Sequence, residues 1–271
     1  MDIAIVIPAR YGSRRFPGKP MAAIRGASLL HRVWLIARAV TGVSRVYVAT
    51  DDERVAGHAR EFGASVIMTA PECENGTVRT HQAVRTLADP PDAVINFQGD
   101  AVLTPPWVLQ GLVDAFHADP ALQLVTPAVH LGWDELEELR KSKETTPFSG
   151  TLVVFDRFMN ALYFSKTIIP SLRERDPAKP PPVYRHIGLY GYSVATLDRL
   201  ATLAPTPLEK TEGLEQLRAL ENGIPIRVVL TDYRGRTHWS VDSPEDAVMV
   251  ETLIARDGEL VPLPQDSSES R

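Results

Sequence analysis

The chain has 271 residues, of which 44% are hydrophobic and 23% charged, and its formal net charge is −5. This composition is typical of a folded globular protein and excludes a broadly basic surface for nucleic acid. The single cysteine, Cys73, excludes an intrachain disulfide and a cysteine-rich metal site. The N-terminus lacks a signal-peptide pattern and no stretch reaches membrane-spanning length, so we expect a cytoplasmic protein with no membrane partner.

Short apolar runs alternate with amphipathic segments through the first 130 residues. Strands are expected at 3–7, 46–49, 66–68 and 93–97, and helices at 21–40, 53–62 and 77–87. Strands and helices that alternate with short connections predict an α/β fold with a doubly wound, mostly parallel sheet.

The pattern changes near residue 131. A charged helix is expected at 134–143, and strands at 150–155 and 186–194. Later segments predict a long helix at 209–222, a strand at 226–229 and a terminal helix at 244–256, with Ser243 as its N-cap. We therefore predict an α/β core at 1–131 and 201–258, an inserted smaller lobe at 132–200, and a flexible tail at 259–271.

The loop that follows the first predicted strand carries the strongest functional signal. It contains two glycines and four cations, which are Gly12, Gly18, Arg10, Arg14, Arg15 and Lys19. Open α/β sheets bind ligands beyond the carboxyl ends of their strands, and glycine amides and basic side chains there suit phosphate groups. The glycine spacing does not fit a Walker loop. The loop therefore predicts a site for a nucleoside triphosphate.

Two aspartates follow predicted strands. Asp100 comes just after the strand at 93–97, and Asp242 precedes the terminal helix. Either one alone is more often a turn residue or a helix cap, but Mg²⁺ at phosphate groups uses one or two such carboxylates. In the same segment, Glu245 is interpreted as a first-turn cap and Asp246 as helix charge.

The basic loop resembles the signature of the 3-deoxy-manno-octulosonate (Kdo) cytidylyltransferases, in which Arg10, Arg15 and Lys19 match and Arg14 does not. Further segments resemble this family in the same order along the chain, to about residue 255. They are residues 49–51, 76–77, 79, 98–100, 162–165, 185–192, 207–209, 214–218 and 241–246.

The resemblance implies a nucleotide-diphospho-sugar transferase-like fold and a cytoplasmic homodimer that dimerises through the region at 132–200. It also implies Mg²⁺ as cofactor, and CTP and an anionic sugar acid as substrates, which react to CMP-sugar and pyrophosphate for lipopolysaccharide biosynthesis. By the same resemblance, Arg15, Lys19 and Asp100 are catalytic, and Asp100 and Asp242 bind the metal. The implied nucleotide contacts are Pro8, Arg10, Arg15, Lys19, Asn75, Gly76, Thr77 and Arg79. The implied contacts to the sugar acid are Gln98, His186, Tyr190, Glu215 and Gln216.

The chain departs from the family pattern near the expected site. Cys73, Asn75 and Val78 replace a His, a Ser and a Glu, Ala101 replaces an acid after Asp100, and a lysine is missing from the segment at 148–154. The acceptor thus stays open between Kdo, its 8-amino analogue, another sialic-acid-like 2-keto acid and a phosphonate. Two other hypotheses are a catalytically weak nucleotide-binding protein and a same-fold enzyme for another base or an aldose phosphate. The retention of both aspartates favours an enzyme.

Overall fold

The computed structural model describes residues 1–13 and 15–264. Arg14 and residues 265–271 of the predicted tail lie outside the described residues. The chain forms two compact units. The first unit comprises Asp2–Pro90, Asn96–Gln110 and the chain from Tyr233 onward; the second comprises Pro91–Ile95 and Gly111–Asp232. The division into a core and a lobe at 132–200 stays a prediction.

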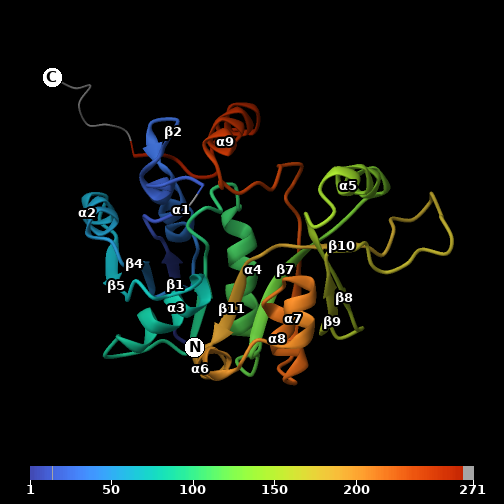
Figure 1. The fold of residues 1–271 in the computed structure, drawn as a ribbon, viewed down its shortest axis with the longest axis horizontal. Coiled ribbons are helices and arrows are strands. Elements are labelled where there is room, and N and C mark those ends of the chain that lie inside the picture. The colour runs from blue at the N-terminus through green and yellow to red at the C-terminus, as the bar shows by residue number, and fades with distance from the viewer. Residues whose placement is uncertain (14, 265–271) are drawn as a thin grey trace. The chain divides into compact units, whose positions relative to one another are not determined.

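The first unit contains a parallel ladder of three strands (Figure 1). β1 (Ile3–Pro8) pairs with β4 (Arg45–Thr50), which pairs with β5 (Ser65–Met68). Every residue of β1 is buried, as a β-branched apolar run in the middle of a parallel sheet requires. The connecting helices are α1 (Leu29–Arg38), α2 (Glu53–Glu61) and α3 (Gly76–Arg85). The strands and helices expected here are confirmed, with one correction.

The predicted helix at 21–40 is wrong in its first third. The 3-10 helix η1 (Lys19–Met21) and a hairpin of β2 (Ala23–Ile24) and β3 (Ala27–Ser28) occupy that stretch. Gly26 turns the hairpin with a φ of 82°, a left-handed conformation that glycine adopts without steric cost. The helix begins only after Ser28, whose hydroxyl accepts the His31 N–H at 3.2 Å.

The last part of the first unit is α9 (Pro244–Asp257), and Ser243 is its N-cap as predicted. The backbone N–H of Arg25, in the turn of the hairpin, donates to Glu251 of α9 at 2.8 Å. Glu259, the first residue of the predicted tail, forms an ion pair of 2.6 Å with the buried Arg32 of α1. The helix α4 (Pro106–Ala118), which begins in this unit, was not predicted.

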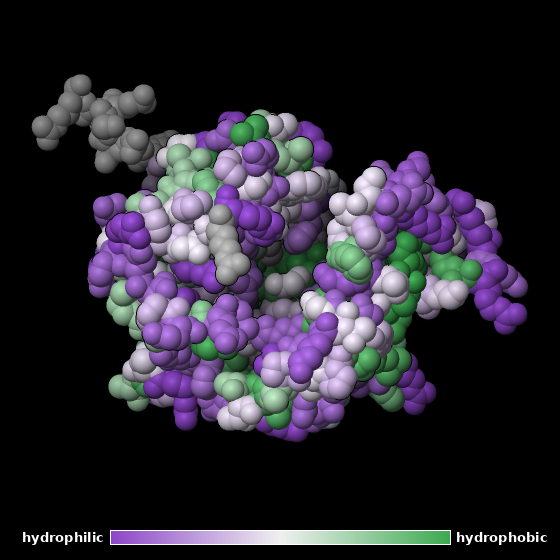
Figure 2. All heavy atoms as spheres, viewed as in Figure 1, coloured by the Kyte–Doolittle hydropathy of each residue, from purple (hydrophilic) through white to green (hydrophobic). Residues whose placement is uncertain are grey.

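The second unit is organised around β7 (Leu124–His130). Its neighbour β12 (Ile226–Thr231) runs parallel to it, while β10 (Tyr184–His186) and β11 (Tyr190–Ser193) pair antiparallel with different parts of it. β8 (Thr151–Phe155) pairs antiparallel with β10 on one side and with β9 (Ala161–Ser165) on the other. The second unit also contains most of the strand β6 (Ala93–Asn96) and the helices α5 (Trp133–Thr145), α6 (Val194–Thr202), α7 (Pro207–Glu212) and α8 (Gln216–Glu221). Hydrophilic side chains cover the visible side of α5, as its charged sequence predicts (Figure 2).

Two predicted elements of this unit are divided in the structure. The strand expected at 186–194 is split into β10 and β11. The Leu189 N–H donates back to the Ile187 carbonyl at 2.7 Å, and the carbonyls of Ile187 and Leu189 both accept from the Thr126 hydroxyl, so the backbone between the two strands is not extended. The helix expected at 209–222 is two helices, α7 and α8. Gly213 separates them with a φ of 63°, and the Leu214 N–H bonds to Glu209 O at 3.1 Å.

The predicted α/β class is confirmed, with helices flanking a mixed sheet. The parallel pairs β1–β4 and β4–β5 come from the alternating first part of the chain, and the antiparallel pairs of the large sheet each include a strand between Thr151 and Ser193. Among the residues that the structure describes, no helix has the length and apolar character needed to cross a membrane.

Candidate active site

A cavity of about 610 Å³ opens within the first unit, at the carboxyl ends of its strands. Three stretches of sequence line it together with Asp242: the loop after β1, the entry to α3, and the turn after β6. Its lining residues are Pro8, Ala9, Arg10, Gly12, Ser13, Arg15, Lys19, Pro20, Cys73, Glu74, Asn75, Gly76, Arg79, Gln98, Gly99, Asp100 and Asp242. The structure thus brings both predicted metal carboxylates and most of the predicted nucleotide contacts to one cavity.

The loop after β1 is folded around Tyr11. The carbonyl of Tyr11 accepts the N–H groups of Ser13 and Gly18 at 2.9 and 3.0 Å. Gly18 has a φ of 73°, and a Cβ there would lie 3.3 Å from the Tyr11 ring. On α2, the guanidinium of Arg54 lies 3.4 Å from the centre of the same ring. These contacts fix Tyr11 relative to Ser13, Gly18 and α2.

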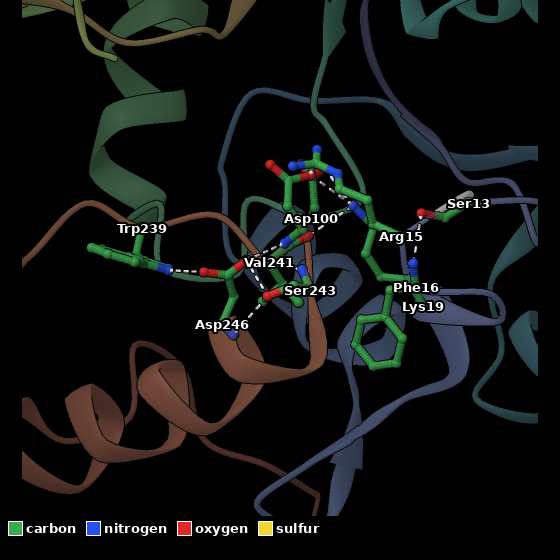
Figure 3. A network of polar contacts seen from close by, with 10 residues as sticks. Ser13, Arg15, Phe16, Lys19, Asp100, Trp239, Val241, Ser243 and Asp246 are labelled. Carbon is green, nitrogen blue, oxygen red and sulfur yellow. Dashed lines mark hydrogen bonds and ion pairs between the residues drawn. The ribbon is translucent and has the colours of Figure 1, made fainter. Parts of the chain in front are cut away.

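Arg15 and Lys19 of this loop form ion pairs with the two aspartates; Figure 3 shows the pair of Lys19 and Asp100. Lys19 Nζ donates to Asp100 Oδ2 at 2.8 Å and to the carbonyl of Val241 at 2.7 Å, and it lies 3.6 Å from Asp242 Oδ1. Arg15 forms an ion pair of 3.1 Å with Asp242. The Lys19 side chain is 14% exposed and that of Arg15 is 69% exposed. Lys19 therefore sits at the base of the charge cluster and Arg15 at its open side.

Two glycines allow backbone and side chains to approach closely around the cavity. A Cβ on Gly76 would lie 2.8 Å from Gln98 Oε1, and a Cβ on Gly99 would lie 2.8 Å from the carbonyl of Pro8. Asn75 caps α3 by accepting the Val78 N–H at 2.9 Å. The change from Ser to Asn at position 75 therefore keeps a good N-cap. Gln98, predicted to contact the sugar acid, lines the same cavity as the predicted nucleotide residues.

Arg79 and Cys73 form a buried part of the wall. The Arg79 guanidinium hydrogen-bonds the Thr69 hydroxyl and pairs with Asp51 at 3.3 Å, so its charge is already engaged by its own chain. Cys73 is 7% exposed, and its thiol donates to Gln82 Oε1 at 3.1 Å. Burial raises the pKa of the Cys73 thiol, which makes it a poor nucleophile. This fits its interpretation as a buried residue at the cavity wall.

One predicted site residue of the first unit lies elsewhere, and Asp246 has contacts beyond those of a helix charge. Thr77, in the first turn of α3, is not among the described residues that line the cavity. Asp246, interpreted from the sequence as helix charge, accepts hydrogen bonds from Asp242, Ser243 and Trp239 (Figure 3). Burial alone would raise the pKa of Asp246, but these hydrogen bonds lower it below its usual value. The spacing of Ser243 and Asp246 is typical of a capping box and can be recognised in the sequence. No sequence pattern indicates the hydrogen bond between Trp239 and Asp246.

The other predicted sugar-acid residues belong to the second unit. His186 is 7% exposed, and its Nε2 lies 2.8 Å from the Thr126 hydroxyl. The ring of Tyr190 is 5.4 Å from that of His186. Burial raises the pKa of Tyr190, and the nearby Tyr192 and Glu215 add to the shift, so its hydroxyl stays protonated. Gln216 is also 7% exposed, and its Nε2 has no hydrogen-bond partner among the described residues.

The donor set of the cavity suits a hard divalent cation. Asp100 and Asp242 approach one ammonium group, that of Lys19, so their carboxylates face a common space. No group of three or more His, Cys, Asp or Glu side chains in the described part of the chain is arranged to hold a metal by itself. Two carboxylates without further protein ligands match the way Mg²⁺ binds at phosphate groups, with the remaining positions left to phosphate oxygens and water.

The model of the family described as "Cytidylyltransferase" matches residues 4–227. The chain belongs to the cytidylyltransferase family. A 3-deoxy-manno-octulosonate cytidylyltransferase of Maricaulis maris is 56% identical over 261 residues, which cover 96% of this chain and 100% of that protein. An 8-amino-3,8-dideoxy-manno-octulosonate cytidylyltransferase of Shewanella sediminis is 37% identical, over 95% of this chain and 100% of that protein.

Solved structures of cytidylyltransferases agree with this assignment. The structure of a CMP:2-keto-3-deoxy-manno-octonic acid synthetase complexed with CTP matches with a TM-score of 0.83 at 33% identity, and it covers 94% of this chain and 99% of that one. A cytidylyltransferase from Leptospira borgpetersenii matches with a TM-score of 0.61 at 16% identity, over 94% and 87% of the two chains, and shares the fold. The resemblance stated from the sequence is thereby confirmed.

Proposed function

We propose that the chain transfers the cytidylyl group of CTP to a 3-deoxy-2-keto sugar acid, with Kdo as the first candidate, and releases pyrophosphate. One observation carries the chemistry. Lys19 holds Asp100 and Asp242 together at a cavity that Arg10 and Arg15 also line. Cations for a triphosphate and carboxylates for its metal are thus assembled in one place.

In the proposed reaction, the anomeric hydroxyl oxygen of the sugar acid forms a bond to the α-phosphorus of CTP. The bond from that phosphorus to the bridging oxygen of the β-phosphate breaks, pyrophosphate leaves, and the hydroxyl proton passes to solvent water. Arg15 and Lys19 bind the triphosphate oxygens and offset the charge that develops on the leaving group. The partly buried Lys19 is held in place by the Val241 carbonyl, so it keeps its direction when the carboxylates turn to other partners.

Mg²⁺ bound by Asp100 and Asp242 would supply charge neutralisation at the phosphate oxygens. These carboxylates are paired with the cations that the triphosphate needs. We therefore expect metal and nucleotide to bind cooperatively. A metal bound alone to Asp100 and Asp242 would leave Arg15 and Lys19 without their carboxylate partners, and a nucleotide bound alone would leave the two carboxylates without their cations.

The acceptor assignment rests on the relatives and on the second unit. The relative that is 56% identical is named for Kdo, and relatives that are 37–38% identical are named for the 8-amino analogue. The buried polar groups of His186, Tyr190 and Gln216 offer a mixed set of donors and acceptors to a polyhydroxylated acid. We place Kdo ahead of the amino sugar because of the higher identity.

The decisive experiment measures pyrophosphate release with Mg²⁺ and CTP, with Kdo, 8-amino-Kdo, sialic acids and small phosphonates as acceptors. ATP, GTP and UTP serve as controls for the base. Release with CTP and Kdo is the expected result, and a preference for 8-amino-Kdo or a phosphonate would correct the acceptor. CTP binding without release for every acceptor would favour a nucleotide-binding protein. Absence of CTP binding would refute the proposal.

We propose that the enzyme works as a homodimer in the cytoplasm, where CTP is available, and supplies activated sugar acid for lipopolysaccharide biosynthesis. The predicted dimerisation region at 132–200 has exposed apolar side chains, with Phe148, Phe158 and Leu162 at 76%, 60% and 62% exposure. Sedimentation equilibrium should give twice the mass of one chain. A Phe158→Glu, Leu162→Glu double variant should shift the protein toward monomer, and an unshifted dimer would move the interface elsewhere.

A further inference from the structure

Asp246, at the third position of α9, accepts four hydrogen bonds with its two carboxylate oxygens (Figure 3). Oδ2 accepts the N–H of Asp242 at 2.9 Å, the N–H of Ser243 at 2.8 Å and the hydroxyl of Ser243 at 3.1 Å. Oδ1 accepts the indole N–H of Trp239 at 2.9 Å. The bonds with Ser243 form a capping box. Those from Asp242 and Trp239 lie outside the helix and have no role in capping it.

These additional bonds fasten the segment that carries Asp242, residues 239–243, which we name the strap. On the cavity side, the strap is held at Val241, whose N–H donates to the carbonyl of Asp100 at 3.2 Å and whose carbonyl accepts from Lys19. On the helix side, Asp246 holds the backbone of the next residue, Asp242. The peptide on each side of the Asp242 Cα is therefore fixed, and the direction in which its side chain leaves the backbone is fixed with it.

The Asp242 side chain itself is less constrained. It is 42% exposed and meets two cations, Arg15 and Lys19, at its Oδ1. Both cations are expected to bind triphosphate oxygens when nucleotide binds, so they cannot be what orients Asp242 in the loaded site. The strap keeps its bonds to Asp246 throughout, because Asp246 faces the helix and the indole rather than the phosphate loop. Asp242 would thus contact the metal, whereas Asp246 would fix the direction of the Asp242 side chain.

We propose that Asp246 is a positioning residue that aims the carboxylate of Asp242 at the metal–triphosphate site, and that Trp239 fixes the outer end of the same arrangement. The proposal rests on the proposed nucleotidyl transfer and on Asp242 as a metal ligand. Asp246 touches neither substrate nor metal in this scheme. Its loss should therefore weaken metal binding more than it weakens binding of the acceptor.

The main test is Asp246→Asn. The amide retains the size of the side chain but leaves one oxygen, in place of two, for four donors. We expect Mn²⁺ affinity, measured by electron paramagnetic resonance in the presence of the unreactive analogue α,β-methylene-CTP, to fall about 10- to 100-fold. The Mg²⁺ concentration for half-maximal activity should rise in parallel, while the KM for the acceptor changes by less than about threefold.

Two matched variants separate positioning from helix capping and helix charge. Ser243→Ala removes the capping hydroxyl but leaves the bonds from Asp242 and Trp239 to Asp246, so we expect a thermal midpoint lower by about 2–4 °C and nearly unchanged Mn²⁺ affinity. Glu245→Gln removes a charge from the same exposed first turn and should leave Mn²⁺ affinity unchanged. Equal losses of metal affinity in all three variants would overturn the proposal, because Asp246 would then act only through the helix.

Trp239→Phe keeps the proposal testable if Asp246→Asn does not fold. The indole is 39% exposed and supplies one donor, so its removal leaves the helix and the strap backbone in place. We expect Mn²⁺ affinity to fall about threefold to tenfold, which corresponds to one lost hydrogen bond to a carboxylate. Wild-type metal affinity in every folded variant would overturn the positioning role alone. A wild-type protein that binds neither CTP nor Mn²⁺ would overturn the proposed function as well.

Discussion

Two places in the first unit join cations and carboxylates that are far apart in the sequence, and they are built differently. The tail pair, Arg32 with Glu259, has a cation that is 4% exposed. Its guanidinium also donates to the carbonyls of Ile24 and Arg25 at 2.7 and 3.0 Å. The loop cluster, Arg15 and Lys19 with Asp100 and Asp242, lines a cavity of about 610 Å³ and has cations that are 69% and 14% exposed.

The difference shows how an acidic protein reserves some cations for a ligand. Arg32 is satisfied by fixed carbonyls and by one carboxylate, so a ligand could take it over only by leaving those groups unpaired. In the loop cluster, Lys19 has one carbonyl partner, that of Val241, and the other partners of the cations are carboxylates. A metal can take over these carboxylates while phosphate takes over the cations. The tail pair therefore stabilises the fold, and we propose that the loop cluster binds the triphosphate. Substitutions should separate these two effects.

The largest effect is expected at Asp100. Asp100→Asn keeps the shape of the side chain but removes a charge at the metal–phosphate site, so kcat should fall by about 10²- to 10³-fold or more. The thermal midpoint should stay near that of the wild type, as the carboxylate is partly exposed. Pyrophosphate release and differential scanning fluorimetry measure the two quantities. Asp134→Asn, on the exposed side of α5, is the control, and turnover within twofold of wild type in Asp100→Asn would refute the metal role.

Arg32→Met should show the opposite behaviour. It leaves the Ile24 and Arg25 carbonyls and the Glu259 carboxylate without their shared donor, so the free energy of unfolding should fall by about 2–4 kcal/mol. The kcat of the folded fraction should stay within about twofold, since Arg32 does not line the cavity. Urea unfolding followed by fluorescence measures the first effect. A large loss of kcat with unchanged stability would contradict the assignment of this pair to the fold.

A smaller effect is expected for Arg15→Ala. Arg15 lies at the open side of the loop cluster, where water screens its charge, so losing one charged hydrogen bond should raise the KM for CTP by about 10-fold. The KM for the acceptor should stay nearly constant. Initial rates over a matrix of CTP and acceptor concentrations give both constants. An unchanged KM for CTP would remove Arg15 from the triphosphate site.

The smallest effect concerns His31, which stacks on Phe62 with ring centres 4.4 Å apart. Burial, together with repulsion from His58 and Arg32, lowers the pKa of His31 below its ordinary value. The unfolded chain thus binds a proton more readily, and the contribution of His31 to stability is present above its ordinary pKa and is lost as the pH falls below it. Arg32→Met should raise the pKa of His31 slightly, because repulsion is a lesser cause than burial. Titration of its ring signals by NMR measures this, and a lower pKa would contradict it.

Local sequence was enough for the elements whose ends carry their own signals. The structure confirms the strand β1 predicted from its apolar run and the predicted N-cap of α9 at Ser243. It also places the glycine- and arginine-containing loop after β1 at the cavity. Local sequence was not enough where the apolar pattern of a strand or helix continues although the backbone leaves that conformation. The helix expected at 21–40 gives way to a hairpin at Gly26, and the helix expected at 209–222 stops at Gly213, since a glycine inside an apolar pattern carries no sign of its φ angle.

By itself, the sequence determined the α/β class, the family and the identity of the charged residues, because these depend on residue types and their order along the chain. Only the tertiary structure decided which charges meet. Lys19 lies 81 residues from Asp100 and 222 from Val241, and the pattern of neither segment points to the other. The same holds for Asp246, which the sequence suggests only as helix charge and whose Oδ1 accepts from the indole of Trp239, seven residues earlier. Hydrogen bonds depend on distances in space, and the folded backbone alone sets those distances.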